Sequence, residues 1–158
     1  MAVPFVRDNK TTLKVAINAP QDVVWDLLAT PEGLSRWLPV ACAGNIGPSG
    51  QFEMAWADDP GPQDLSTHRV TIWEPRRRFA FTWPGVQLNF EIARQDIMTV
   101  VRLSCTYNAR EAGSDQQLEE LVGWTMHLLT LKSVAENGVD LRTPDRAFSW
   151  EKGFITGI

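Results

Sequence analysis

The hydrophobic pattern of the chain changes from strand-like to helical, returns to strand-like, and ends in one long helical stretch. Residues 12–18 alternate apolar with polar or small side chains, as a half-buried strand does. Residues 21–29 and 31–38 group their apolar side chains as two short helices, and Pro31 suits the first position of the second. The chain is therefore predicted to begin with one strand and two short helices.

A run of about six antiparallel strands is predicted for the middle of the chain. Between residues 44 and 107, apolar and polar positions alternate in short stretches separated by Gly, Pro and Asp. Residues 58–64 have the composition of an exposed loop. The alternation gives the strands one inward face, made of Phe52, Met54, Trp56, His68, Val70, Ile72, Phe79, Phe81, Trp83, Leu88, Phe90, Val101, Leu103, Cys105 and Tyr107.

Residues 115–140 predict one long helix, which begins at a cap at Ser114 or Asp115 and ends near Asn137–Gly138. Stepped at helical spacing, one broad arc of it is apolar: Leu118, Leu121, Val122, Leu128, Leu129, Leu131 and Ala135. The opposite side, which we expect to be solvated, carries Glu119, Glu120, His127 and Thr130. We expect the helix to pack across the concave face of the sheet through Leu121, Thr125, Leu128 and Leu129.

This order of elements predicts an α+β protein, in which a curved antiparallel sheet wraps around a long C-terminal helix. An apolar arc as wide as that of the long helix needs a curved partner. At 158 residues, the chain fits a single domain that buries a sizeable core. We expect one domain over residues 1–158, with its core at about residues 10–140 and a C-terminal extension at 141–158.

Composition and motifs exclude several classes of function. A net charge of −4 argues against a general nucleic-acid binder, which needs a basic face. No signal peptide and no membrane-spanning run is found, so the expected location is the cytoplasm. Cys42 and Cys105 lack metal or redox spacing, and two reduced thiols are expected there, with one disulfide between them as the alternative. No metal-ligand cluster, catalytic motif or nucleotide-binding loop is present, so no cofactor and no catalytic residue is assigned.

Three segments resemble the START-like or SRPBCC superfamily: APQDVVWDLLATPEGLSRWLP at 19–39, RVTIWEPRRRFAFTW at 69–83 and GWTMHLLTLK at 123–132. The last is similar to the branch related to the C-terminal domain of the heat-shock-protein ATPase activator. The resemblance covers roughly residues 10–140. It implies a helix-grip fold with an apolar cavity between the sheet and the long helix. Members bind lipids, hormones and polyketides, cyclise aromatic products, or assist other proteins.

The expected ligand site combines the inward face of the sheet with the inner face of the long helix. Its lining is predicted to be Trp56, His68, Val70, Phe79, Phe81, Trp83, Phe90, Val101, Leu103, Tyr107, Thr125, Leu128 and Lys132. Small-molecule pockets combine such an apolar wall with a few placed polar groups. The strand pattern alone fits equally well a centre filled by large rings, without a void.

Individual polar residues of this lining have two interpretations each. His68 takes an apolar position in its strand, either as an orienting group or base, or as a half-buried histidine hydrogen-bonded near the strand end. Tyr107 is either a donor to a ligand or bonded to a backbone group. Lys132 either extends its amine to water or pairs with an acidic group of a ligand at the pocket mouth.

Three functions remain open at this point. A hydrophobic small-molecule binding protein is preferred, with a chaperone-associated or regulatory interaction module as the alternative. A cyclase- or hydrolase-type enzyme using His68 and Tyr107 is the third. The apolar tail, with Phe148, Trp150 and Phe154, is expected either to pack on the parent domain or to bridge a homodimer.

Overall fold

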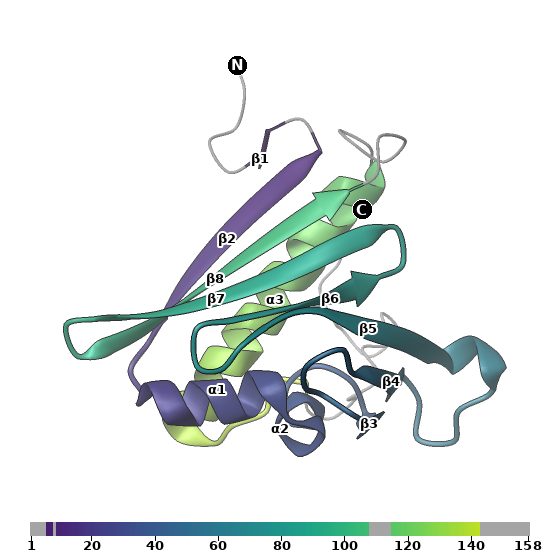
Figure 1. Ribbon diagram of the computed structural model, residues 1–158, viewed down its shortest axis with the longest axis horizontal. Coiled ribbons are helices and arrows are strands. Elements are labelled where there is room, and N and C mark those ends of the chain that lie inside the picture. The colour runs from purple at the N-terminus through teal and green to yellow at the C-terminus, as the bar shows by residue number, and fades with distance from the viewer. Residues whose placement is uncertain (1–5, 8, 108–114, 143–158) are drawn as a thin grey trace.

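The computed structural model describes residues 6–7, 9–107 and 115–142 (Figure 1). Its elements follow the predicted order, with one additional short strand at the start. In chain order they are β1 (Val6–Arg7), β2 (Lys10–Ile17), α1 (Gln21–Ala29), α2 (Pro31–Ser35), β3 (Ala41–Gly44), β4 (Gln51–Ala55), the 3-10 turn η1 (Pro62–Asp64), β5 (Leu65–Glu74), β6 (Arg78–Trp83), β7 (Val86–Gln95), β8 (Met98–Tyr107) and α3 (Asp115–Asn137).

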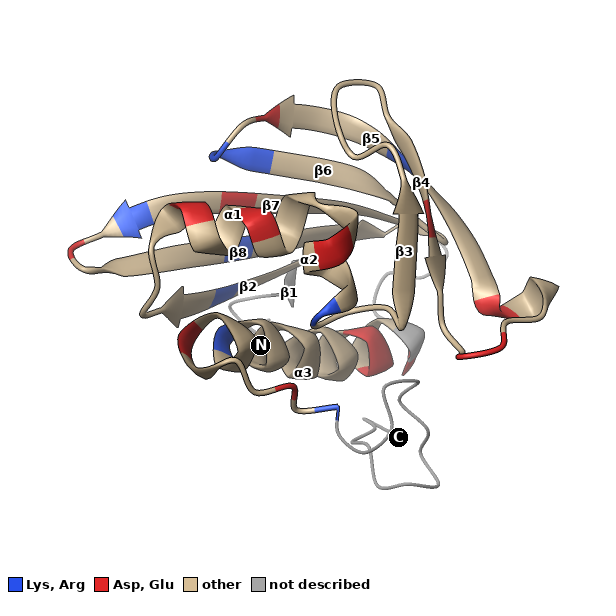
Figure 2. Ribbon diagram, turned by 90° about the horizontal axis from the view of Figure 1, so that it is seen from below, with Lys and Arg blue, Asp and Glu red and all other residues tan. Residues whose placement is uncertain are grey.

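The described strands form one antiparallel sheet in the order β1-β2-β8-β7-β6-β5-β4-β3. Figure 1 shows this sheet curving in front of α3, with α1 and α2 across its lower end. In Figure 2, α1 and α2 lie on the same side of the sheet as α3, and the acidic residues of α1 are visible along the helix. The predicted α+β helix-grip fold is confirmed.

The two short helices are joined by a single threonine. The Thr30 hydroxyl accepts from the backbone N–H of Gly33 at 2.9 Å and so caps α2, and it donates to the carbonyl of Asp26 at 2.7 Å. A side chain at Gly33 would collide with that same carbonyl, because a Cβ there would lie 1.9 Å from it. This junction is why α1 and α2 pack so closely.

One bulge changes which side chains of β5 face the core. The register shifts between Val70 and Ile72, and beyond it Trp73 pairs with Phe79. The Trp73 ring packs on Phe79 at 5.7 Å and on Trp25 of α1 at 5.3 Å. The strict alternation predicted Trp73 on the outer face, which is wrong, because a bulge inserts one residue and turns the following side chains over.

The face that α3 buries differs from the predicted one. Its buried side chains are Gln117, Trp124, Leu128, Thr130, Leu131 and Val134. By contrast, Leu118 and Leu129 are 51% and 44% exposed, and Thr125 is exposed as well. At 100° per residue, the buried face is rotated by roughly 100° from the predicted arc. Leu128 lies on both faces, so its predicted packing is retained.

Two residues that looked polar in the sequence explain this rotation. The Thr130 hydroxyl donates to the carbonyl of Met126 at 2.9 Å, so it is satisfied inside the helix and can be buried. The His127 ring packs edge-on against Trp124 at 5.1 Å, and its Nδ1 is shielded from water. The residue as a whole is half-buried, so the prediction of a solvated His127 is wrong.

A buried arginine ties the chain after α3 to the end of α2. The Arg142 guanidinium donates to the carbonyls of Leu38 at 3.1 Å, Pro39 at 2.8 Å and Ser35 at 2.9 Å. It also pairs with Asp140 at 2.8 Å, and its side chain is fully buried. By sequence this residue belongs to the C-terminal extension, and no role was predicted for it. The predicted packing of the tail at 143–158 lies outside the described residues.

Candidate functional site

A chain of ring contacts crosses the concave side of the sheet from β4 to α3. Trp56 meets Trp83 at 5.7 Å, and Trp83 meets Trp124 of α3 at 5.3 Å. The imidazole of His68 is stacked between two rings, with Trp83 at 5.1 Å and Phe52 at 5.3 Å. The indole of Trp83 therefore joins the strands to the helix at this end of the sheet.

The centre of the sheet is filled by aromatic rings. Phe79, Phe81 and Phe90 are all fully buried. The ring centroids of Phe79 and Phe81 lie 5.0 Å apart, and those of Phe81 and Phe90 lie 6.0 Å apart. Trp56 and Trp83, at the end of this cluster, are only half-buried. The interpretation in which large rings fill the centre therefore describes the middle of the sheet. At the end where Trp56 and Trp83 lie, ring surface is partly exposed, so that a further molecule could contact it.

His68 is fully buried at this end, and both of its ring nitrogens are hydrogen-bonded. Its Nδ1 lies 2.7 Å from the carbonyl oxygen of Thr82, and its Nε2 lies 2.7 Å from the Ser66 hydroxyl. Burial in this apolar environment lowers the pKa of His68 below its usual value, against the opposing effect of the Thr82 carbonyl. The imidazole is therefore neutral at pH 7.

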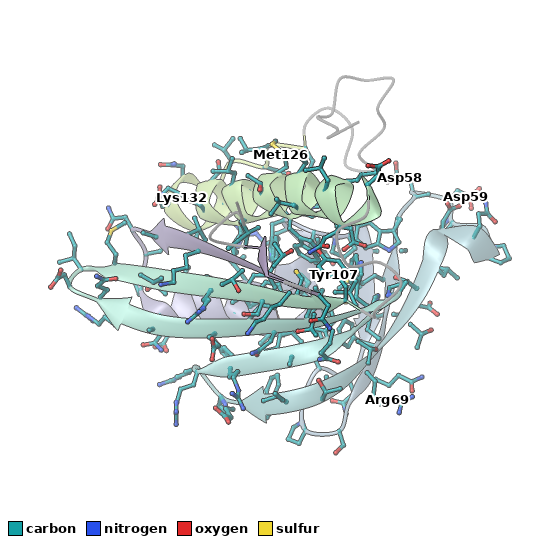
Figure 3. The ribbon with its side chains drawn as sticks, turned by 90° about the horizontal axis from the view of Figure 1, so that it is seen from above. Asp58, Asp59, Arg69, Tyr107, Met126 and Lys132 are labelled. Carbon is teal, nitrogen blue, oxygen red and sulfur yellow. The ribbon has the colours of Figure 1, made fainter. Side chains whose placement is uncertain are left out.

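Tyr107 closes the same end of the sheet on β8. The residue is 2% exposed, and the side chains of Thr11 and Cys105 lie beside its buried hydroxyl without forming a well-aligned hydrogen bond. Burial raises the pKa of this phenol above its usual value, and the neighbouring Cys105 and Glu120 act in the same direction. Figure 3 shows Tyr107 between α3 and the sheet. The phenol is thus a neutral donor inside the fold.

His68 and Tyr107 share a row across the sheet but do not meet. Thr82, which bonds His68, pairs with Gln87 on β7, and the adjacent Val86 pairs with Tyr107 on β8. Three strand spacings of about 4.8 Å put the two side chains roughly 14 Å apart. At this separation the two groups cannot exchange a proton directly. They therefore do not form the acid–base pair that the sequence suggested.

The remaining predicted lining divides into buried and displaced residues. The buried ones lie on the inner sides of the sheet and of α3: on the strands Val70, Phe79, Phe81, Phe90, Val101 and Leu103, and on α3 Leu128. Thr125 points away and donates to the carbonyl of Leu121 at 2.8 Å. Lys132 donates to the carbonyl of Ala16 at 2.5 Å and pairs with Glu136 at 2.6 Å. The predictions that these two face the site are wrong, because α3 is rotated and Lys132 is held at its other end (Figure 3).

The predicted lining omitted three residues that the structure brings to this end. Ser66 bonds His68, Trp124 packs on Trp83, and Gln117 donates to the hydroxyl of Thr11 at 3.1 Å. The signal for Ser66 was present, since it lies two positions before His68 on the same face of a strand. Gln117 gave no signal, because a buried glutamine on a helix resembles a solvated one in sequence.

The opposite, convex face of the sheet carries a charged groove. Its volume is about 580 Å³, and its lining includes five basic side chains and two acidic ones. The basic ones are Lys14, Arg77, Arg78, Arg94 and Arg102. This face is therefore locally basic, although the chain as a whole is acidic.

Other features of the described residues bear on chemistry. Cys42 and Cys105 are both free thiols, and burial raises the pKa of each to about 12. In the described ranges, no three His, Cys, Asp or Glu side chains are grouped so as to hold a metal ion. Within the same ranges, no helix has the length and apolar character to cross a membrane.

Comparison with known structures identifies relatives of the fold. A conserved protein of unknown function from Enterococcus faecalis matches with a TM-score of 0.72 and 18% identity, over 89% of this chain and 81% of its own. The Aha1 dimer from Colwellia psychrerythraea matches at 0.68 and 18%, over 82% and 97%. CalU16 from Micromonospora echinospora matches at 0.66 and 21%, over 91% and 74%. At such identities the likeness shows the fold alone.

The sequence itself matches one family model. Residues 18–136 fit the model described as "Activator of Hsp90 ATPase homolog 1-like protein". This match confirms the resemblance to the START-like superfamily, and to its branch related to the heat-shock-protein ATPase activator, that was based on the first helices, the middle strands and the long helix. No curated protein matches the sequence significantly.

Proposed function

Because the chain belongs to the family of activator of Hsp90 ATPase homolog 1-like proteins, we propose that it binds a small apolar molecule on the concave side of its sheet. The observation that carries the proposal is the pair of half-buried indoles of Trp56 and Trp83, at the end of an otherwise filled aromatic core. Covering apolar surface gains about 25 cal/mol per Å², so two large indoles supply much of the affinity of a small ligand.

The buried phenol of Tyr107 supplies the polar part of this proposal. A buried donor without a well-aligned partner costs up to roughly 1–3 kcal/mol, which a ligand oxygen or a water molecule would offset. Apolar sites typically combine a large hydrophobic wall with one or two such groups that fix the orientation of the ligand. The ligand class favoured here is therefore a flat or chain-like apolar molecule with an acceptor oxygen.

The test is a titration with a fluorescent apolar probe, followed by displacement with hydrophobic compounds. Alanine substitutions of Trp56 and Trp83 should weaken probe binding by about tenfold or more, the effect of losing roughly 1.4 kcal/mol. Trp73→Ala is the matched control, because Trp73 is also half-buried but lies at the α1 end of the sheet. Equal affinities in all three variants would contradict the proposal.

A second function, as a protein-interaction module, is favoured by the convex groove. Its surplus of basic side chains suits an acidic segment of a partner protein. Binding of a labelled poly-glutamate peptide should weaken with added salt and be lost when Arg77 and Arg94 are both changed to Glu. A salt-independent interaction would contradict this assignment.

A homodimer belongs to the same proposal. One structural relative is described as a dimer in solution, and Leu118 and Leu129 leave apolar surface on the outer side of α3. Analytical ultracentrifugation of the full chain should give twice the monomer mass, and Leu129→Glu should reduce it. A monomer mass at high concentration would refute the dimer.

A further inference from the structure

Ser66 and His68 form a polarised pair on the concave side of β5. The Ser66 Oγ lies 2.7 Å from Nε2 of His68, and the opposite ring nitrogen lies 2.7 Å from the Thr82 carbonyl. A carbonyl oxygen only accepts, so the ring proton of the neutral imidazole is on Nδ1. Nε2 therefore accepts the hydroxyl proton of Ser66. This is the order of hydrogen bonds in which a histidine activates a serine, with a carbonyl as the group that orients the ring.

A third hydrogen bond fixes the serine. The indole Nε1–H of Trp56 donates to the Ser66 Oγ at 3.0 Å. Since one lone pair of Oγ is used in this way, its own O–H is directed at the imidazole. Ser66 is half-buried, whereas His68, its hydrogen-bond partner, is fully buried.

The surroundings of the imidazole keep it available as a base. The side chains packed on it from β4 and β6 are the rings of Phe52, Phe81 and Trp83, none of which is charged. Burial lowers the pKa of His68 below its usual value, so the base form is present at neutral pH. The nearest described histidine on α3, His127, is separated from this site by Trp124 and Trp83.

We propose that Ser66 is a nucleophile that takes an acyl group from a small ester with an apolar acyl chain. The Ser66 Oγ attacks the ester carbonyl carbon while Nε2 of His68 takes the hydroxyl proton. The bond from that carbon to the leaving oxygen then breaks, and the leaving oxygen takes the proton from Nε2. An acyl-serine and a free alcohol result. A water molecule then attacks the acyl carbon while Nε2 of His68 takes its proton. The bond from that carbon to the Ser66 Oγ breaks, Oγ takes the proton back from Nε2, and the carboxylic acid is released.

The apolar indoles beside the serine determine the class of ester. Trp56 and Trp83 lie against the Ser66–His68 pair, so an aliphatic or aromatic acyl chain would be in contact with ring surface. The thiols do not compete at neutral pH, because burial raises the pKa of Cys42 and of Cys105 to about 12. This acyl transfer to Ser66 is independent of the proposed binding function, whose ligand need not be an ester.

The full chain should be incubated with p-nitrophenyl hexanoate at neutral pH and mapped by peptide mass spectrometry. A hexanoyl group is expected on Ser66, with release of nitrophenolate. Ser66→Ala should abolish this adduct, and His68→Gln should slow its formation by about 100-fold, a typical contribution of a general base. Thr67→Ala is the matched control, since Thr67 is the exposed neighbour on the opposite face of β5, and its rate should equal that of the unchanged protein.

In the adduct and variant experiments, two results would overturn the proposal. One is hexanoylation confined to lysine or cysteine side chains. The other is a Ser66 adduct that forms equally fast in folded His68→Gln, with folding checked by circular dichroism. If that variant does not fold, the pH profile of the unchanged protein decides. The rate of Ser66 acylation should reach its plateau by neutral pH, and a rate that still rises tenfold per pH unit above pH 8 would show hydroxide-driven chemistry instead.

Discussion

At the scale of single residues, this protein holds both of its histidines in largely apolar surroundings. His68 is fully buried among rings, and His127 packs on Trp124. Burial lowers the pKa of each, that of His127 to about 3, with the charge of Arg142 acting in the same direction on His127. Because burial disfavours the charged form of an imidazole, both rings are neutral at pH 7.

Acid should therefore destabilise the fold through these residues. The unfolded chain takes up histidine protons near pH 6.5, above the pKa of the folded state, so stability is complete above that pH and falls as the pH drops through it. We expect the melting temperature to decrease between pH 7 and pH 5, and to decrease less in His68→Gln. Melting curves measured by circular dichroism at both pH values test this. An identical decrease in the variant would show that His68 does not contribute.

The buried guanidinium of Arg142 is a second residue-scale determinant. Its removal leaves three backbone carbonyls and Asp140 without their donor at the junction of α2 and α3. We expect Arg142→Ala to cost roughly 3–5 kcal/mol of unfolding free energy, the range for a buried ion pair that loses one partner. Denaturant titration provides the value, with exposed Arg69→Ala as control. A loss below about 1 kcal/mol would contradict this role.

At the scale of elements, the orientation of α3 about its own axis is the clearest departure from the sequence analysis. The length and the end of the helix at Gly138 were predictable from periodicity and a glycine stop, and Gly138 indeed has a positive φ of 71°. The buried face was not. Thr130 and His127 count as polar in any hydrophobicity pattern, yet one bonds within its own helix and the other packs on an indole.

A pair of leucines tests this orientation. Leu128 is 4% exposed and Leu129 is 44% exposed, although both were predicted to pack on the sheet. Leu128→Ala should cost roughly 2–5 kcal/mol, as a buried leucine does. Leu129→Ala should cost less than about 0.5 kcal/mol, as exposed positions do. Denaturant melts of both variants provide the comparison, and equal losses would restore the face predicted from the sequence.

In the strands, too, one feature was predictable from the sequence and another was not: the inward faces were, and the bulge in β5 was not. Alternation identified the inward face of β6, β7 and β8, because a period of two puts every second side chain on one side. It could not locate the bulge in β5, since Thr71, Ile72 and Trp73 are all good strand residues. The position of the bulge depends on how Trp73 packs against α1, which is a tertiary contact.

At the scale of the whole molecule, the fold places two unlike surfaces on the two sides of one sheet. The concave side carries aromatic rings that end in two half-buried tryptophans. The convex side carries the basic groove. The inward apolar face of the sheet was largely predictable from alternation. The bond of His68 to Thr82 and the surroundings of the Tyr107 hydroxyl were not, because both depend on positions across neighbouring strands.

The indole N–H signals of the tryptophans in a ¹H–¹⁵N NMR spectrum test the central claim most directly. The chain has seven tryptophans, and their signals report on different parts of the molecule. On titration with an apolar ligand that binds the protein, the signals of Trp56, Trp83 and Trp124 should shift together. Those of Trp25, Trp37 and Trp73, near the short helices, should stay in place. Shifts confined to the second group, or none at saturation, would contradict binding on the concave side.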